Sequence, residues 1–170
     1  IPEPFGCTLH ISPWNYPFQL ALNTVIGAVA AGNTVVLKPS EYAHFTSGIV
    51  NDIIVEAFKP EHVCVIQGDA QTSANLLSLR WDYVFFTGST NVGKIVAKAS
   101  AENLTPYTLE LGGKNPCVVD ETAPIALSAR RIVWGKYVNC GQTCIAPDYL
   151  LVHKSKVNEL TQAMAKEIKK

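Results

Sequence analysis

The stretch VFFTGSTNVGK, residues 84–94, joins a strand-like run to a helix-like run through a glycine turn. Ser89 or Thr90 can cap the helix that follows, and the amide groups at the start of that helix can hold a phosphate. The spacing GxxxxGK from Gly88 to Lys94 comes close to the P-loop pattern, but Ile95 stands where a hydroxyl residue would ligate Mg²⁺. The G-x-G-x-x-G of the ordinary dinucleotide fold is also missing. By itself the stretch predicts a phosphate-bearing nucleotide as ligand, and a glycine turn that serves only geometry is the alternative.

The same order of strand and helix runs through the whole chain. Expected strands cover residues 7–11, 33–39, 62–68, 82–88, 108–111, 116–120 and 149–154, and expected helices cover residues 16–31, 44–58, 70–79, 89–103, 123–139 and 156–170. Alternation with short connections predicts parallel strands and crossover helices, which is a doubly wound, Rossmann-like α/β sheet. Ligands of such sheets bind beyond the carboxyl ends of the strands, so we expect the chemistry in the turns that follow strands.

Composition narrows the class of protein. The chain has 170 residues, of which 48% are hydrophobic and 16% charged, as in one domain of ordinary size or one domain with a piece of another. Its 14 basic and 14 acidic residues cancel, so no basic surplus favours nucleic acid or an anionic membrane. The apolar residues 25–31 are too few for a membrane span. The opening IPEPFG and the helix-like ending KEIKK indicate a piece of a longer protein, expected in the cytoplasm.

Two further turns carry charged side chains. VVLKPSE, residues 35–41, places Lys38 and Glu41 after a strand, where they can hydrogen-bond ribose hydroxyls; an exposed charge pair in a loop is the alternative. TLELGGKNP, residues 108–116, places Glu110 in an apolar strand. Partial desolvation there would favour the neutral carboxyl and bring it toward the range of a general base. A glutamate on an edge strand that faces water is the alternative.

The turn after the first strand carries an amide. ISPWNYP, residues 11–17, places Asn15 between aromatic and proline residues. A fixed side-chain amide can stabilise an oxyanion, although an asparagine alone is more often a turn residue or a helix cap.

Cysteines supply the remaining chemistry. YVNCGQTCIAPDY, residues 137–149, carries Cys140 and Cys144, and zinc is not expected there because a second cysteine pair and histidines with ligand spacing are missing. A thiol beside Gly141 and Gln142 remains, where backbone amides could lower its pKa and bind an oxyanion. The other cysteines lie in apolar runs and are expected to be buried, as small hydrophobic residues: Cys7, Cys64 and Cys117.

In their order and spacing, PWNYP, KPSE, FTGS, LELGGK and NCGQTC resemble the aldehyde dehydrogenase superfamily over all 170 residues. WGKYVNCGQTCIAPDY and LTPYTLELGGKNPCVVD look closest to its class 3, fatty-aldehyde-like branch. The resemblance implies most of an NAD(P)-binding domain in residues 1–111 and the start of a catalytic domain in residues 112–170. It also implies NAD or NADP as cofactor, an aldehyde as substrate and a homodimer as the full-length protein, whereas this chain alone is expected to be inactive.

Each matching residue takes a role from the resemblance. Cys144 of GQTC matches the nucleophile, whose thiolate forms a thiohemiacetal with the aldehyde, and Asn15 and the Cys144 amide match the oxyanion donors. The intermediate gives hydride to the nicotinamide and becomes a thioester, which water activated by Glu110 hydrolyses. Contacts with the adenosine ribose, the phosphates and the nicotinamide side of the cofactor are implied for Trp14, Lys38, Glu41, Gly88, Ser89, Gly93 and Gly112. No metal is implied.

Several alternatives stay open at this point. Cys140 is expected to be packed as a bystander, with a disulfide to Cys144 under oxidation as the alternative. Glu41 would favour NAD by repelling a 2′-phosphate, but the class 3 branch often uses both cofactors. A P-loop-type nucleotide-binding protein built on Gly88–Lys94 is a second function, against which Ile95 argues. A non-catalytic module that keeps the fold is a third, but it would not need Cys144, Asn15 and Glu110 together.

Overall fold

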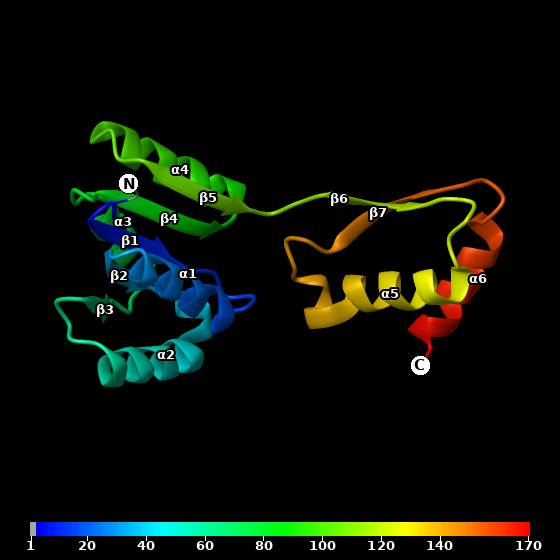
Figure 1. Cartoon of the computed structure of the whole chain (residues 1–170), viewed down its shortest axis with the longest axis horizontal. Coiled ribbons are helices and arrows are strands. Elements are labelled where there is room, and N and C mark those ends of the chain that lie inside the picture. The colour runs from blue at the N-terminus through cyan, green and yellow to red at the C-terminus, as the bar shows by residue number, and fades with distance from the viewer. Residues whose placement is uncertain (1–2) are drawn as a thin grey trace. The chain divides into compact units, whose positions relative to one another are not determined.

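The computed structural model describes residues 3–170, and the chain divides into two compact units, unit 1 (Ile1–Leu111) and unit 2 (Gly112–Lys170) (Figure 1). Each unit has its own sheet and its own apolar core. No helix within residues 3–170 is long and apolar enough to cross a membrane. The assignment of cofactor binding to unit 1 and of catalysis to unit 2 stays a prediction.

Unit 1 is built on a parallel sheet of five strands in the order β3-β2-β1-β4-β5. The strands are β1 (Cys7–Ile11), β2 (Thr34–Lys38), β3 (Val63–Val65), β4 (Tyr83–Gly88) and β5 (Tyr107–Leu111). The chain runs outward from β1 to β3 on one side and from β4 to β5 on the other, so the order reverses between β1 and β4. This is the switch point at which doubly wound sheets bind their ligands, and the predicted fold class is confirmed.

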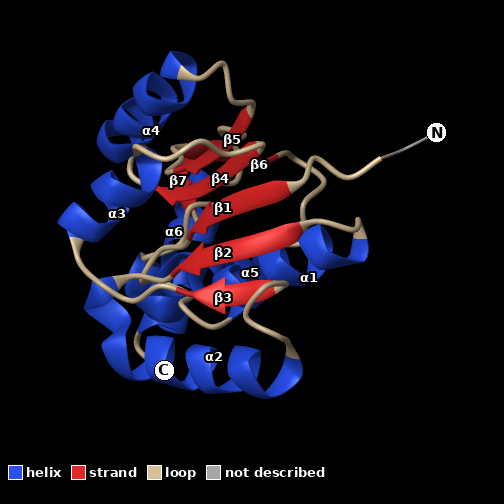
Figure 2. Ribbon diagram, turned by 90° about the vertical axis from the view of Figure 1, so that its left-hand side faces the viewer, coloured by secondary structure: helices blue, strands red, loops and turns tan. Residues whose placement is uncertain are grey.

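Helices cover both faces of this sheet. Figure 2 shows α1 (Gln19–Ala30) and α2 (His44–Ala57) on one side, and α3 (Ala70–Leu77) and α4 (Thr90–Glu102) on the other. Because side chains alternate along a strand, β1 and β4 direct Leu9 and Phe86 into a cluster with Val96 of α4. On the opposite face, Leu37 packs with Val25 of α1. These two clusters hold the carboxyl ends of the strands in one row.

The edge strand β3 is shorter than the predicted run over 62–68. It ends at Val65, which pairs with Leu37 of β2. The neighbouring strand β2 ends one residue later at Lys38 and is followed by Pro39, which has no N–H for a ladder. Beyond this point β3 has no strand to pair with, so residues 66–68 form a loop.

Unit 2 is a two-stranded parallel sheet with two helices. Its elements are β6 (Asn115–Val119), α5 (Ile125–Tyr137), the 3₁₀ helix η2 (Val138–Gly141), β7 (Pro147–Val152) and α6 (Val157–Ile168). Val119 of β6 packs against Ile125 and Ala129 of α5 and against Leu160 of α6. The segment that leads from α5 to β7 carries both Cys140 and Cys144.

Candidate active site

The charged pair after β2 is fixed by burial. Lys38 is only 2% exposed, and its Nζ donates a hydrogen bond of 2.8 Å to Oε2 of the half-buried Glu41. The Ser40 hydroxyl accepts from the Tyr42 amide at 3.3 Å and so begins the short 3₁₀ helix η1 (Glu41–Ala43). Partial burial by itself would raise the pKa of the Glu41 carboxyl, but the hydrogen bond and the charge of Lys38 bring that pKa below its ordinary value. The alternative of an exposed loop pair is therefore excluded.

A cavity adjoins this pair at the carboxyl ends of β2 and β3. It has a volume of about 210 Å³ and is lined by Pro39, Ser40, Glu41, His44, Ser47, Gln67 and Gly68. Gly68 has φ of +153°, and a Cβ atom there would lie 2.2 Å from Oγ1 of Thr72. Residue 68 must therefore be glycine for the loop to pack against Thr72, and Glu41 supplies the cavity with an ionised acceptor.

The turn after β4 forms as predicted, with Ser89 as the cap. The Ser89 hydroxyl accepts a 3.3 Å hydrogen bond from the Val92 amide, whereas Thr90 is the first residue of α4. Gly93 is buried, and a Cβ atom there would lie 2.8 Å from Cδ2 of Leu111. A Cβ atom on Gly88 would lie 2.5 Å from Cζ of Phe86. Close packing alone explains both glycines, so a nucleotide role for the turn stays a prediction.

Asn15 and Trp14 lie in the turn that follows β1. This turn begins where the Ser12 amide donates to the Lys38 carbonyl at 3.1 Å. Trp14 is 47% exposed and Asn15 is half-buried. Because β1 pairs with both β2 and β4, the turn follows the central strand of the row that also carries Lys38 and Gly88. The structure therefore brings these unit 1 residues to one edge of the sheet, at the switch point.

Glu110 does not have the environment expected of it. On β5, Leu109 and Leu111 pack against the cluster on the α4 side, so alternation directs Glu110 to the opposite face. Its side chain is exposed. The expected partial desolvation is wrong, because β5 is the edge strand of the sheet and α4 packs against only one of its faces. Within this chain, Glu110 is the water-facing glutamate of the alternative interpretation.

The cysteines of unit 2 lie in a loop with unusual backbone. Asn139, Cys140 and Gly141 are consecutive residues in the left-handed region, with φ of 52°, 56° and 76°. Only glycine adopts this region without steric cost, so the first two positions store strain of about 1–3 kcal/mol each. This left-handed turn follows the end of α5, and Cys140 and Cys144 are both exposed. The expectation that Cys140 is packed is therefore wrong.

The remaining cysteines are less buried than predicted. Cys7 is exposed because it is the first residue of β1, and Cys64 and Cys117 are half-buried. Burial raises the pKa of the Cys64 thiol, as does, to a lesser degree, the proximity of Cys7. All five thiols are free. Within residues 3–170, no three His, Cys, Asp or Glu side chains come together in a way that could hold a metal ion.

Two residues to which the sequence-based predictions gave no site role hold the Cys144 turn, although the diglycine was expected to permit close backbone approach. The side-chain amide Nδ2 of Asn115 donates to the carbonyl oxygens of Cys144, at 2.7 Å, and of Ala146, at 3.1 Å. A Cβ atom on Gly113 would lie 2.6 Å from the Cys144 carbonyl oxygen. By contrast, a Cβ atom on Gly112 would meet nothing within 4 Å. Gly113 and Asn115 were visible in the LELGGKNP stretch, but only their contact with a turn about 30 residues away shows what they do.

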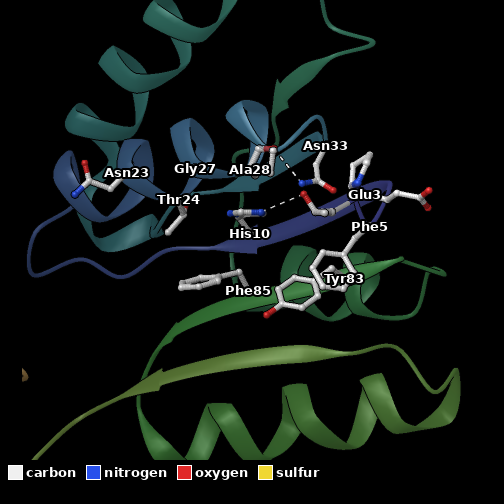
Figure 3. Close-up of a pocket in the computed structure, with 13 residues that line it drawn as sticks. Glu3, Phe5, His10, Asn23, Thr24, Gly27, Ala28, Asn33, Tyr83 and Phe85 are labelled. Carbon is white, nitrogen blue, oxygen red and sulfur yellow. Dashed lines mark hydrogen bonds between the residues drawn. The ribbon is translucent and has the colours of Figure 1, made fainter. Parts of the chain in front are cut away.

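A second cavity, of about 450 Å³, lies between α1 and strands β1 and β4 (Figure 3). His10 lies in its wall, with its Nε2 3.1 Å from the Thr8 hydroxyl. Since that hydroxyl donates to the Thr34 carbonyl at 2.9 Å, the imidazole proton must be on Nε2. Nδ1 of His10 is buried without a hydrogen-bond partner among residues 3–170. Desolvation lowers the pKa of His10 to about 4, so the ring is neutral at physiological pH.

The five-stranded parallel sheet, whose strand order reverses between β1 and β4, defines a doubly wound α/β protein. The sequence model described as "Aldehyde dehydrogenase family" matches residues 1–170, and the chain belongs to this family. It is 50% identical over 167 residues to 4,4'-diaponeurosporen-aldehyde dehydrogenase of Staphylococcus aureus, covering 98% of this chain and 36% of that protein. It is 45% identical over 168 residues to aldehyde dehydrogenase family 3 member A2 of Mus musculus, covering 99% and 35%.

Solved structures agree with this assignment. The chain superposes with a TM-score of 0.91 on the crystal structure of Mycobacterium tuberculosis aldehyde dehydrogenase complexed with NAD+, at 34% identity, covering 98% of this chain and 35% of that one. The chain thus spans about a third of the length of the relatives that it matches. The resemblance to the superfamily is confirmed, and a family 3 member is among the relatives, as the predicted class 3 branch requires.

Proposed function

We propose that this protein is an NAD(P)-dependent aldehyde dehydrogenase that converts an aldehyde to a carboxylic acid through a covalent intermediate on Cys144. One observation carries the proposal. All 170 residues of this chain match the family model, and the chain has an exposed cysteine, Cys144. The turn that carries Cys144 is held by side-chain hydrogen bonds. A non-catalytic module would have no use for such a thiol.

Residues of unit 1 fit a dinucleotide. The ionised Glu41, held by Lys38, offers acceptors for ribose hydroxyls beside a cavity. The N-terminus of α4, capped by Ser89, offers backbone amides for a phosphate, and Gly88 brings the chain into this turn. The negative charge of Glu41 disfavours the 2′-phosphate of NADP, while the paired Lys38 offsets part of that repulsion. We therefore propose NAD or NADP, bound along this edge of the sheet, with Trp14, Gly93 and Gly112 lining its path.

The proposed chemistry begins at Cys144. Its thiolate attacks the aldehyde carbon, a C–S bond forms, and the carbonyl electron pair moves to oxygen to give the thiohemiacetal. The Asn15 amide and the Cys144 backbone N–H donate hydrogen bonds to the developing oxyanion. Bound NAD(P) would supply the hydride acceptor that turns this thiohemiacetal into a thioester.

Deacylation is assigned to Glu110. Its carboxylate accepts a proton from a water molecule as that water attacks the thioester carbonyl, after which the C–S bond breaks and Cys144 leaves as the thiolate. The exposure of Glu110 supports this role, because water has access to an exposed carboxylate. Hydrolysis, rather than transfer of the acyl group to coenzyme A, is the outcome that a glutamate at this position favours.

The test uses the complete gene product, supplied with an aldehyde and NAD. We expect reduced nicotinamide to form with the wild type and with Cys140→Ala, and to be absent with Cys144→Ala. Mass spectrometry of the wild type quenched during turnover should find the acyl group on Cys144. Activity that survives Cys144→Ala would contradict the assigned nucleophile. A folded wild type that binds NAD but oxidises no aldehyde would instead favour the non-catalytic module.

Two further properties are proposed on narrower grounds. The free thiols support a reducing compartment, which is the cytoplasm in our proposal. The family resemblance supports a homodimer as the complete protein. Sedimentation of the complete gene product tests the dimer, and a monomer at micromolar concentration would contradict it.

A further inference from the structure

A backbone hydrogen bond joins the two ends of the turn that carries Cys144. The Ala146 amide donates to the Thr143 carbonyl at 3.1 Å, which makes residues 143–146 a β-turn with Cys144 and Ile145 at its centre. Ala146 is buried and anchors the end of the turn, whereas Cys144 is exposed. The carbonyl groups of Cys144 and Ala146 are not used by the turn itself, so their orientation depends on donors from elsewhere in unit 2.

Asn115 supplies both donors. Its Nδ2 lies 2.7 Å from the Cys144 oxygen and 3.1 Å from the Ala146 oxygen. Because a carbonyl oxygen only accepts, the amide orientation is unambiguous, and the two hydrogens of one NH₂ group serve the two carbonyls. Asn115 is half-buried, and its bond to the Ala146 oxygen is partly shielded from water, whereas its bond to the Cys144 oxygen is exposed.

The strands beside Asn115 lack backbone N–H donors that could hold this turn. Asn115 is in register with Pro147, the pairing is irregular between Asn115 and Pro116, and neither proline has an N–H to donate. The ladder between β6 and β7 is therefore weakest where it meets the Cys144 turn. The side-chain amide of Asn115 takes the place of the missing backbone donors.

Gly113 completes the arrangement by leaving space. An added Cβ atom would lie 2.6 Å from the Cys144 oxygen, closer than a carbon and a carbonyl oxygen approach without a shift of the backbone. The Cys144 carbonyl can therefore reach Asn115 only because residue 113 has no side chain. Two neighbouring residues, Gly113 and Asn115, thus set the direction of the same peptide group.

We propose that Asn115 is a positioning residue for the Cys144 nucleophile, with Gly113 as its steric counterpart. This proposal rests on the proposed aldehyde dehydrogenase function. By clamping the carbonyls of Cys144 and Ala146, Asn115 holds the backbone that aims the sulfur and the Cys144 N–H at the aldehyde. Misplacement of reacting groups by about 1 Å lowers rates by orders of magnitude, so such a clamp acts on the chemical step rather than on substrate binding.

The experiment compares three variants of the complete gene product. Asn115→Leu keeps the branched shape of the side chain and removes both donors. Asn115→Ser retains one donor, and Asn158→Leu alters an exposed asparagine of α6 in the same unit as a matched control. The readouts are kcat and KM for an aldehyde, and hydrogen exchange of the backbone amides in residues 143–146.

We expect Asn115→Leu to lower kcat about tenfold, as the loss of one to two hydrogen bonds gives, with KM changed less than about twofold. Asn115→Ser should recover part of kcat, Asn158→Leu should match the wild type, and exchange in residues 143–146 should be faster only in the Asn115 variants. An unchanged kcat in folded Asn115→Leu, or a change confined to KM, would overturn the proposal. If Asn115→Leu does not fold, Asn115→Ser is judged by the same criteria.

Failure of the proposed function has a different signature. A wild type without aldehyde oxidation would remove the enzyme assignment, whatever the variants do. In that case the clamp itself is tested by hydrogen exchange. Faster exchange in residues 143–146 of Asn115→Leu would retain Asn115 as the residue that fixes the Cys144 turn, and unchanged exchange would remove it.

Discussion

Mild acidification should destabilise unit 1 through His10. This side chain is 5% exposed, its Nε2–H donates to Thr8, and its Nδ1 is buried without a partner among the described residues. A second proton on Nδ1 would place a charge in the apolar cavity of Figure 3, with Phe85 stacked on the ring. Burial therefore lowers the pKa of His10 from 6.5 to about 4.

The change in the free energy of unfolding with pH follows from the number of protons that the folded and unfolded chains bind. Between these two pKa values the unfolded chain binds more protons at His10 than the folded chain does, so the stabilising contribution is complete above pH 6.5 and is lost as the pH falls through 6.5 toward 4. The shift corresponds to about 3 kcal/mol in total, of which about 2 kcal/mol is lost between pH 7.5 and about pH 5. Glu41, Asp69 and Asp120 have ordinary values of 4.5 and 3.8 and lowered pKa values, so they contribute little in this range.

The assay is urea unfolding of the chain at both pH values, followed by the fluorescence of the buried Trp81. Replacing the exposed Trp14 and Trp134 by phenylalanine leaves this single reporter in unit 1. His10→Gln is neutral at both pH values and serves as the matched variant. We expect the free energy of unfolding to fall by about 2 kcal/mol more in the histidine protein than in His10→Gln. Equal losses in the two proteins would refute the argument that burial keeps His10 neutral.

Three other substitutions test the sites described above. Ser89→Ala removes the cap of α4 and should cost unit 1 about 1 kcal/mol in the same unfolding assay; no loss would show that the 3.3 Å bond does not stabilise the helix. Lys38→Met removes the buried partner of the Glu41 carboxylate, which we propose as a ribose acceptor, and should weaken NAD binding to the complete gene product about tenfold by calorimetry. An unchanged affinity would place the ion pair outside the proposed cofactor site. Gly113→Ala should destabilise unit 2 by about 1–3 kcal/mol, because the added Cβ atom meets a backbone oxygen; the fluorescence of Trp134 reports the unfolding. Gly112→Ala is the control and should be near neutral, because its Cβ atom would lie in open space. Equal effects of the two substitutions would contradict the steric argument.

Local pattern was sufficient for most elements. The strands β1 and β4 and the helix α4 lie where apolar alternation and the serine cap predicted them, because these signals act over a few residues. The order β3-β2-β1-β4-β5 agrees with the doubly wound prediction, since short connections between alternating elements permit few topologies. Among the strands of unit 1, β3 departs most from its expected bounds, because its length depends on its partner strand.

Environment was harder to predict than position. Glu110 was expected in a partly desolvated setting, and Cys7 and Cys140 in a packed one, yet all three side chains are exposed. Glu110 and Cys7 lie in apolar runs, but one faces water from an edge strand and the other from the start of a strand. Cys140 lies in a polar stretch, and its exposure follows from a left-handed turn that the sequence pattern did not indicate.

The sequence by itself determined the class of this protein: motifs in a fixed order predicted the aldehyde dehydrogenase resemblance, and the alternation of short apolar runs predicted the parallel sheet. Only the tertiary structure showed that Lys38 is buried against Glu41, that His10 is held neutral, and that Asn115 and Gly113 hold the Cys144 turn. The physical reason is the distance along the chain over which each kind of interaction acts. Helix and strand preferences, caps and turns are set by neighbours in the chain, whereas burial, pKa shifts and side-chain clamps are set by atoms that folding brings together from distant positions.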